Sequence, residues 1–577
     1  MKRLLRYLSD YKKECICAPL FKMLEASFEL CIPLVVAAII DNGIPSNNHG
    51  YLIRMCLLMA LLGAIGLTST LFAQFFSAKA AVGFSKKLRR DMMAHIQTLT
   101  YTDLDHIGTS TLITRMTGDV NQVQTGVNLT LRLLLRSPFI VFGAMIMAFT
   151  VDHKSALIFG TVILALSVVV FGIMLITIPL YRKVQEQLDG VTEISRENLA
   201  GYRVIRAFRK ENDEIKQFSA ANKRLTAMQN RVGKISALMN PLTYVIVNFG
   251  VIVLVYTSAK RVDAGVLTTG SVVALYNYLS QILVELVKLA NLIITLTKTA
   301  ASADRIADML ENGGDTEKIE DFALPDKKGS ICFDHVSLTY DGAGEASLTD
   351  ICLSAKQGET IGIIGGTGAG KSSLVNLIGR FYEPTAGTLT IDGIDSHAFP
   401  KNILREKIGF VPQKAVLFRG TIRENLKWGN ANATDAELLE AVAAAQASDI
   451  LAAKANGLDE PISENGSNLS GGQRQRLTIA RALVRKPEFL ILDDSASALD
   501  YATDAALRKA LRDLPYHPTV FIVSQRTASI RFADRILVLE DGQPVMVGTH
   551  DELLASCSIY QEIHYSQFSK EVNANAT

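Results

Sequence analysis

Eight consecutive residues carry a pattern suited to phosphate chemistry. They read Gly365-Gly366-Thr367-Gly368-Ala369-Gly370-Lys371-Ser372, and Ser373 follows. Glycines let backbone N–H groups wrap phosphate oxygens, Lys371 adds a positive charge near the β and γ phosphates, and the Ser372 hydroxyl can ligate Mg²⁺. A strand-like segment over residues 360–364 precedes the loop, and a helix predicted over residues 374–379 points its positive dipole end at the same anion. The spacing therefore predicts a loop that binds ATP with Mg²⁺.

Two further motifs follow this phosphate loop. A pentapeptide reads Leu469-Ser470-Gly471-Gly472-Gln473, and an apolar run over residues 490–492 ends in Asp493 and Asp494. Such a run is typical of a buried parallel strand, so we expect the Asp493 carboxylate at the carboxyl edge of a sheet, where α/β proteins bind ligands. The order of phosphate loop, pentapeptide and acidic strand end resembles the nucleotide-binding domain of an ABC ATPase.

The resemblance implies roles for individual residues. It implies that Gly365 to Ser373 hold ATP, that Tyr340 stacks on adenine, and that Ser372, Gln413 and Asp493 hold Mg²⁺ directly or through water. ABC ATPases pair two such domains head to tail, so the pentapeptide residues Ser470, Gly471, Gly472 and Gln473 would face the nucleotide of a second domain. The chain has one phosphate loop and one pentapeptide, so it requires a partner. A strand-end tyrosine and a loop glutamine without ligand roles are the simpler alternatives for Tyr340 and Gln413.

The chain departs from the family pattern at two catalytic positions. Asp494 stands where the family usually has glutamate, and Gln525 stands where it usually has histidine. Aspartate retracts the carboxylate by roughly 1.5 Å, and a misplacement of about 1 Å can cost on the order of 10²-fold in rate. The Gln525 amide can donate a hydrogen bond to the γ-phosphate but offers no titratable proton and no positive charge. Either change alone could be drift; together they predict weak hydrolysis at this site, as in one subunit of heterodimeric ABC exporters.

The first half of the chain has the composition of a membrane protein. Apolar residues make up 49% of the chain. A bilayer core needs about 20 apolar residues per helix, so six long apolar runs predict six spanning helices. The runs cover residues 16–40, 55–76, 133–151, 155–181, 235–259 and 264–284. Lys22, Glu25 and Glu29 interrupt the first run, and a core helix that does not span is the alternative there.

Basic residues near the ends of the runs predict the orientation. Lys and Arg gather before the first run, after the second and after the fourth, whereas the opposite connections carry few. By the positive-inside rule, both termini and the ATP-binding half are cytoplasmic, and the chain lies in the plasma membrane. The two long inner connections resemble the cytoplasmic extensions of ABC exporters, whose tips dock on nucleotide domains. These tips fall near residues 101–107 and 202–212.

These features resemble an ABC exporter half-transporter. We expect an all-α transmembrane domain with six spanning helices over residues 1–310 and a linker over 311–328. Residues 329–577 are expected to form an α/β P-loop nucleotide-binding domain with an α-helical signature subdomain. The resemblance implies ATP-driven export of amphipathic or hydrophobic small molecules together with a second half-transporter, as a heterodimer. A homodimeric lipid or peptide exporter and an ATP-gated regulatory membrane protein are the alternatives, and no nucleic-acid partner is expected.

Polar residues inside two of the runs bear on the substrate. Glu25 and Glu29 lie four residues apart in the first run, and Asn277, Gln281 and Glu285 repeat that spacing in the last. Ionisable residues within spans are costly and are candidates for function, so an acidic cavity for cationic or amphipathic molecules is one interpretation. A lysine lies three residues from Glu25 and another three residues from Glu285, so ion pairs without a substrate role are the other.

Overall fold

The protein divides into two compact units. A computed structural model describes residues 2–46, 48–314 and 328–567 of the 577-residue chain. The first unit comprises Met1–Gln97 and Gly108–Gly313, and the second comprises Thr98–Ile107 and Gly314–Thr577. Most of the linker predicted over residues 311–328 lies outside the described residues.

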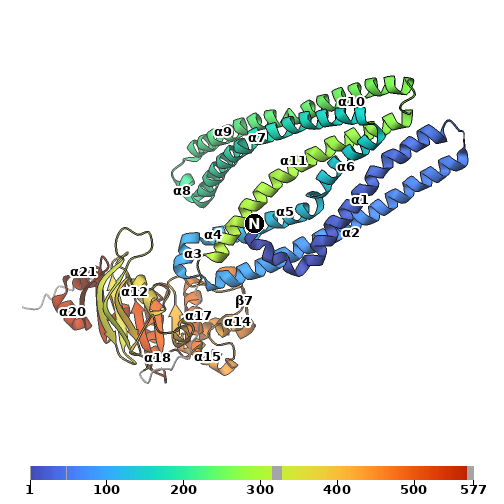
Figure 1. Ribbon diagram of the computed structural model, residues 1–577. Helices are drawn as coiled ribbons and strands as arrows, with labels where there is room; N and C mark the ends of the chain where they lie inside the picture. The colour runs from blue at the N-terminus through green and yellow to red at the C-terminus, as the bar shows by residue number, and fades with distance from the viewer. Residues whose placement is uncertain (1, 47, 315–327, 568–577) are drawn as a thin grey trace, which may run out of the picture. The chain divides into compact units, whose positions relative to one another are not determined.

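Among the described residues, six long helical segments form the first unit (Figure 1), which confirms the six-helix prediction. Each is long and apolar enough to cross a bilayer, and the segments run over Arg3–Gly43, His49–Thr98, Thr109–Val151, His153–Ala200, Glu211–Asp263 and Thr269–Glu311. Each extends beyond its apolar run because the helix continues into polar sequence. The component elements are η1 (Lys2–Tyr11), α1 (Lys12–Ala38), η2 (Ile39–Gly43), α2 (His49–Thr98), α4 (Thr109–Thr114), η3 (Arg115–Asp119), α5 (Val120–Leu133), α6 (Arg136–Val151), α7 (His153–Ala200), α8 (Tyr202–Ala207), α9 (Glu211–Ala237), α10 (Met239–Asp263) and α11 (Thr269–Glu311).

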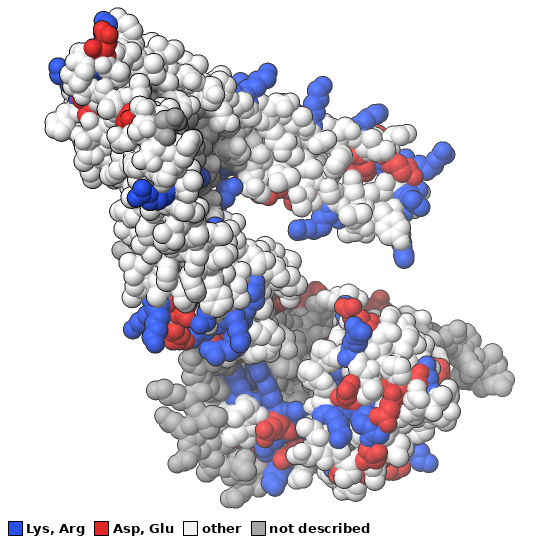
Figure 2. All heavy atoms as spheres, turned by 90° about the vertical axis from the view of Figure 1, so that its right-hand side faces the viewer, with Lys and Arg blue, Asp and Glu red and all other residues white. Residues whose placement is uncertain are grey.

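Apolar side chains cover the outside of this unit as well as its core. Figure 2 shows a broad face of the helices with few charged side chains and with Lys and Arg gathered toward helix ends. Large apolar side chains that are more than half exposed include Leu57, Leu61, Leu164, Leu175, Phe249 and Ile252. Helices that are apolar on all faces are stable within lipid, where this surface needs no protein partner.

Close packing around α11 organises the helical unit. This helix contacts α1, α5, α6, α7 and α10. Glycines allow the backbones to approach: a Cβ atom on Gly126 of α5 would lie 2.1 Å from Oγ1 of Thr299, and one on Gly250 of α10 would lie 2.6 Å from Cγ2 of Val162. Small residues at such contacts are typical of helices that pack within membranes.

A six-stranded sheet forms the centre of the second unit. Its order is β12-β11-β3-β10-β9-β6, with β12 antiparallel to its neighbour and the other strands parallel. The strands are β3 (Thr360–Gly365), β6 (Ile408–Val411), β9 (Phe489–Asp493), β10 (Thr519–Val523), β11 (Arg535–Glu540) and β12 (Gln543–Gly548). Strands β9 and β10 are buried along their whole length, as expected for parallel strands covered on both faces. The carboxyl ends of the parallel strands therefore meet at one edge of the sheet.

Smaller sheets and helices complete the second unit. An antiparallel sheet of order β2-β1-β4-β5 consists of β1 (Ile331–Leu338), β2 (Leu348–Ala355), β4 (Ala386–Ile391) and β5 (Ile394–Asp395), and β7 (Gly420–Thr421) pairs with β8 (Pro461–Ile462). The helices are α12 (Lys371–Ile378), α13 (Lys401–Lys407), α14 (Ile422–Lys427), α15 (Asp435–Ala444), α16 (Ser448–Ala452), α17 (Gly471–Val484), α18 (Tyr501–Arg512), α19 (Thr527–Ile530), α20 (His550–Ser556) and α21 (Ser558–Gln567). Helices α14 to α17 lie between β6 and β9 in sequence and confirm the predicted helical subdomain within an α/β domain.

The first predicted cytoplasmic tip is a short helix that packs within the second unit. This helix, α3 (Tyr101–Ile107), belongs to that unit rather than to the long helices on either side of it. The Tyr101 ring lies 4.7 Å from the ring of Phe381, and the Tyr382 hydroxyl donates a hydrogen bond of 2.5 Å to the Asp105 carboxylate. Burial and this carboxylate both raise the pKa of Tyr382, so the hydroxyl keeps its donor proton. An apolar and a polar contact together fix α3 against the loop that follows α12.

Candidate functional site

One cavity in the second unit gathers most of the predicted site residues. It has a volume of about 660 Å³ and lies at the carboxyl edge of the parallel strands. The loops after β3, β6, β9 and β10 all contribute to it, as expected for a ligand site in an α/β sheet. Its predicted lining residues are Thr367, Gly368, Ala369, Gly370, Lys371, Ser372, Ser373, Gln413, Asp493, Asp494 and Gln525. The sequence did not point to Glu345, Ser347, Asp541 and Gly542, which line the cavity from two other loops.

Glycines shape the phosphate loop in the way its spacing predicts. Gly368 and Gly370 have φ values of 87° and 85°, a conformation that other L-residues rarely adopt. A Cβ atom on Gly370 would also lie 2.6 Å from the backbone oxygen of Ser347. Helix α12 begins at Lys371, three residues earlier than the predicted 374–379 helix, because Gly370 ends the turn and leaves Lys371 free to start the helix. The free N–H groups of α12 therefore point into the cavity from the loop itself.

Lys371 is held against the loop. Its ammonium group donates hydrogen bonds to the backbone oxygens of Gly365 and Gly366 at 3.0 and 2.5 Å. Burial lowers the pKa of Lys371, and the carboxylates of Asp494 and Asp493 act in the opposite direction. The ammonium group is thus positioned where phosphate oxygens can replace backbone oxygens as acceptors.

Three groups predicted to hold Mg²⁺ lie at this edge of the sheet. The Ser372 hydroxyl donates a hydrogen bond of 3.1 Å to the Asp493 carboxylate, and Asp493 ends β9 with 6% of its surface exposed. Burial raises the pKa of Asp493, while the Ser372 hydrogen bond opposes that rise. Gln413 lines the cavity beside them, and its side chain hydrogen-bonds to Asp494. Hydroxyl, amide and carboxylate oxygens are the ligands that Mg²⁺ prefers, so these residues fit the ion.

Asp494 has a fixed backbone. Its φ is 47°, in the left-handed region that aspartate tolerates better than most residues. The Asp494 N–H donates to the Val523 oxygen at 3.0 Å, and the Ser497 hydroxyl donates to the Asp494 backbone oxygen at 2.8 Å. Burial raises the pKa of Asp494, whereas Gln413 and Lys371 act to lower it. The hydrogen bonds with Val523 and Ser497 hold the main chain of Asp494 on both sides.

Gln525 also lines this cavity. Its side chain is exposed, and its backbone oxygen accepts a hydrogen bond of 2.6 Å from the Gln567 amide. The residue follows β10, so it reaches the cavity from the strand next to β9. Asp494 and Gln525 therefore occupy neighbouring strand ends, as their predicted joint role requires.

Tyr340 lies near the phosphate loop rather than in the cavity lining. Its hydroxyl donates a hydrogen bond of 2.9 Å to the Ser373 hydroxyl. Its half-buried ring packs perpendicular to the ring of Tyr382 at 4.8 Å. In this arrangement Tyr340 supports the start of α12, and its stacking on adenine stays a prediction.

The pentapeptide forms the N-terminus of helix α17 and is not among the residues that line the cavity. The Ser470 hydroxyl accepts from the N–H of Gln473 at 3.3 Å, and the Gln473 side chain accepts from the N–H of Ser470 at 2.9 Å. This reciprocal capping box explains the Ser and Gln spacing in local terms. It leaves the other free N–H groups of the first turn, including those of Gly471 and Gly472, for an acceptor outside the chain.

A charged cluster joins three helices in the first unit. Arg136, at the start of α6, donates to Glu285 of α11 at 2.6 Å and to Glu29 of α1 at 2.7 Å. The Ser137 hydroxyl also donates to Glu285 at 2.8 Å. The sequence analysis did not identify Arg136, because its two glutamate partners lie 107 and 149 residues away and no local spacing links them.

Both predicted i,i+3 ion pairs are present in this cluster. Lys22 pairs with Glu25, and Lys288 lies 2.8 Å from Glu285. The interpretation as paired charges therefore holds for Glu25 and Glu285. A cavity of about 350 Å³ beside the cluster is nevertheless lined by the predicted polar stripe, with Glu29, Asn277, Ser280, Gln281, Glu285 and Lys288 on its wall and apolar Ile32, Pro33, Val36 and Val284 between them.

Comparisons with known proteins agree with this architecture. Residues 15–286 match the ABC transporter transmembrane region, and residues 348–497 match the ABC transporter family. The chain is 35% identical over 572 residues to YfiB of Bacillus subtilis, named an uncharacterized ABC transporter ATP-binding protein, with 99% of each chain covered. It is 30% identical to YgaD of the same organism, whose name provisionally assigns it to multidrug export as an ATP-binding/permease protein, with 98% of each chain covered.

A solved structure shares the fold. The structure of a bacterial Atm1-family ABC exporter with ATP bound superposes with a TM-score of 0.82, at 23% sequence identity. The match covers 97% of this chain and 99% of the other. The order of six apolar helices followed by an α/β nucleotide-binding unit is therefore an exporter fold.

Proposed function

This chain belongs to the ABC transporters, and from that premise we propose that it is one half of a heterodimeric ATP-driven exporter whose own ATP site hydrolyses weakly. One observation carries the proposal: the cavity at the sheet edge gathers residues 367–373 of the phosphate loop together with Asp494 and Gln525 at the two hydrolytic positions. The chain binds ATP at this site, and the partner's site supplies most of the turnover.

The phosphate loop and its neighbours hold the nucleotide. The backbone N–H groups of residues 366–371 and the N-terminus of α12 receive the phosphates, and Lys371 exchanges its backbone acceptors for phosphate oxygens. Ser372 would hold Mg²⁺, with Gln413 and Asp493 beside it. When bound, Mg²⁺ neutralises charge on the phosphates. Tyr340, whose hydroxyl donates to Ser373, is the residue that would stack on adenine.

Hydrolysis is weak because neither of the two hydrolytic positions carries the residue that the family usually has there. The Asp494 carboxylate is short, its backbone is anchored, and it already accepts a hydrogen bond from Gln413. Gln525 can touch the γ-phosphate but cannot supply the positive charge that a protonated histidine brings. Both departures reduce the rate of the chemical step and leave the binding contacts in place.

Two exposed surfaces support a partner with its own nucleotide domain. The first is the α17 N-terminus, whose capping box leaves N–H groups pointing outward. The second is the tip at α8, where Tyr202, Val204 and Phe208 are 49%, 60% and 74% exposed. The equivalent tip, α3, has a packing partner within its own chain, because the ring of Tyr101 contacts Phe381 while staying 43% exposed. An exposed apolar tip such as α8 suits a docking surface on the partner's nucleotide domain, as α3 docks beside Phe381 in this chain.

The substrate proposed is an amphipathic or hydrophobic small molecule carried across the plasma membrane, outward from the cytoplasm. The cavity on α1 and α11 is lined by apolar residues, by amides and by one partly exposed carboxylate, Glu29. Such a mixed lining suits a molecule that has both an apolar and a polar part. The relative named for multidrug export supports the same substrate class. Basic residues beside the inner connections support a cytoplasmic nucleotide domain and cytoplasmic termini.

The decisive experiment compares this chain alone with a pair. The chain and its closest genomic neighbour of the same architecture are purified singly and after co-expression, reconstituted in lipid, and assayed for steady-state ATP hydrolysis. Turnover only by the pair is the expected result. Comparable turnover by the chain alone would identify a homodimer in which Asp494 suffices. ATP binding without turnover in either sample would point instead to an ATP-gated regulatory protein.

A further inference from the structure

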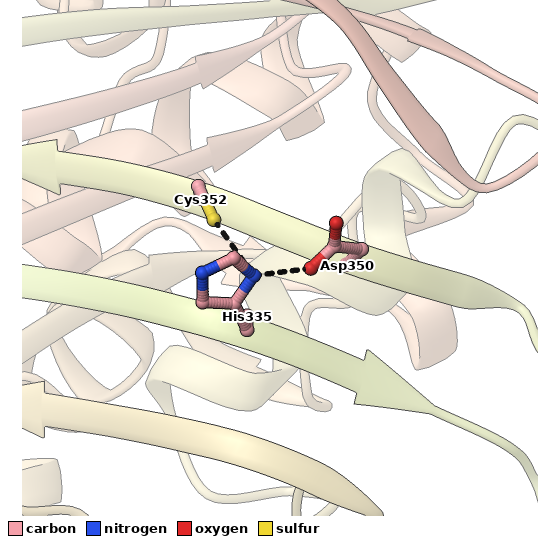
Figure 3. A group of neighbouring side chains, drawn as sticks. All are labelled: His335, Asp350 and Cys352. Carbon is pink, nitrogen blue, oxygen red and sulfur yellow. Dashed lines mark hydrogen bonds and ion pairs between the residues drawn. The ribbon is translucent and has the colours of Figure 1, made fainter.

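We propose that His335, Asp350 and Cys352 form a binding site for a divalent transition-metal ion of the Zn²⁺ type on the antiparallel sheet of the second unit. The three side chains project from β1 and β2 toward one another (Figure 3). Nδ1 of His335 lies 2.5 Å from Oδ1 of Asp350 and 3.6 Å from Sγ of Cys352. All three side chains are exposed, and none of them lines the nucleotide cavity. The site is independent of the function proposed above.

Two adjacent irregularities in the sheet bring these donors together. In the first, Asp334 and His335 on β1 lie opposite Cys352 alone on β2. In the second, Asp350 is one of two β2 residues opposite Ser337 of β1. Bulges of this kind re-aim side chains and are frequent beside functional sites. His335 and Asp350 have φ values of 51° and 57°, and non-glycine residues in that region carry strain that is concentrated at functional positions.

The strained backbone is fixed by its neighbours. On β4, a Cβ atom at Gly387 would lie 2.1 Å from the backbone oxygen of His335, so the next strand packs directly against the bulge. On the other side, the N–H of Asp350 donates to the Ser337 hydroxyl at 3.1 Å. The donors therefore stand on a rigid surface, which lowers the entropy lost when an ion orders them.

The donor set selects the class of ion. Thiolate, imidazole and carboxylate are the three ligand types that Zn²⁺ takes, whereas Mg²⁺ and Ca²⁺ take oxygen ligands. Tetrahedral bonds of about 2.0 Å to nitrogen and 2.3 Å to sulfur imply an N···S separation of about 3.5 Å, close to the 3.6 Å between His335 and Cys352. The His335–Asp350 hydrogen bond must lengthen as the ion replaces its proton. Three protein ligands leave the fourth position to water.

A further carboxylate lies on the other side of the imidazole. Oδ1 of Asp334 lies 3.9 Å from Nε2 of His335. Histidines that bind metals commonly present their second nitrogen to a carboxylate, which fixes the ring and strengthens the ligand. The imidazole of His335 thus lies between two acidic side chains, an arrangement that favours a cation.

Cobalt provides a spectroscopic test because a thiolate bound to Co²⁺ gives a charge-transfer band that other ligands do not give. Co²⁺ is titrated into the full chain in detergent, without an affinity tag and with its thiols reduced, and Zn²⁺ is then added in competition. We expect the band to saturate at one equivalent and to disappear with Zn²⁺. Cys352→Ser should abolish it, and His335→Asn should weaken binding at least about ten-fold.

Two choices keep this test clear. Asparagine tolerates the left-handed backbone at position 335 better than alanine, so loss of binding in His335→Asn does not require unfolding. Cys332→Ser is the matched control, since Cys332 is another exposed cysteine on β1. The proposal is overturned if wild type and Cys352→Ser titrate alike, or if the band is lost in Cys332→Ser instead.

Discussion

The two sides of the nucleotide cavity differ in how they are built. On the phosphate side, Gly368, Gly370 and the start of α12 set the backbone, and Lys371 is already held in place. On the other side, where we propose that hydrolysis is weak, Asp494 and Gln525 line the cavity from two neighbouring strand ends. The first side depends on main-chain conformation and the second on side-chain length and charge.

This difference separates binding from turnover. A loop that binds through backbone N–H groups keeps its affinity when neighbouring side chains change. A catalytic carboxylate, in contrast, loses rate steeply with a displacement of about 1 Å. The same sheet edge can therefore keep an intact ATP-binding surface while its hydrolytic residues diverge, provided that a second site performs the chemistry.

The largest effect on the ATPase rate is expected at the pentapeptide, which we propose completes the ATP site of the partner. Ser470→Arg in this chain should lower the ATPase rate of the assembled pair by on the order of 10²-fold, because it removes the α17 capping box and blocks N–H donors that stabilise transferred charge. Ser467→Arg, at an exposed serine just before the pentapeptide, is the control. Size-exclusion chromatography confirms that both pairs assemble. Full turnover by the Ser470→Arg pair would contradict a shared site.

A smaller effect is expected on the phosphate side. Lys371→Ala should weaken ATP binding at this chain's own site by roughly 10- to 150-fold, the loss expected when charge-assisted hydrogen bonds are removed. Photolabelling by an ATP analogue, quantified on each subunit separately, measures this affinity. Lys356→Ala serves as the control because Lys356 is an exposed lysine beyond β2. Unchanged labelling of Lys371→Ala would exclude the phosphate-loop assignment.

Features that a short continuous segment determines could be predicted from the sequence. The six apolar runs and the glycine spacing of residues 365–372 each specify their structure within a short segment, and both tips were placed within a few residues of α3 and α8. The helix after the loop began earlier than predicted. The apolar pattern begins at Leu374, but Gly370 in the left-handed conformation allows the helix to start at Lys371.

Features that depend on distant residues were not predictable. Arg136 contacts Glu29 and Glu285, which lie 107 and 149 residues away, and no periodicity links them. The carboxylate and thiol that face His335 depend on two bulges, which only the pairing of β1 with β2 reveals. The interaction of Gln413 with Asp494 likewise arises where β6 and β9 become neighbours.

The smallest effect should follow from lengthening Asp494 alone. In a pair whose partner site is disabled, Asp494→Glu should raise ATPase activity by less than about two-fold, because groups that act as a unit in catalysis are non-additive and Gln525 still lacks a charge. The backbone anchored by Val523 and Ser497 also directs the longer side chain along the present path. Asp494→Glu combined with Gln525→His should restore more than either change alone. Strong rescue by Asp494→Glu alone would mean that carboxylate reach is the only defect, and that Gln525 is as competent as histidine on this side of the cavity.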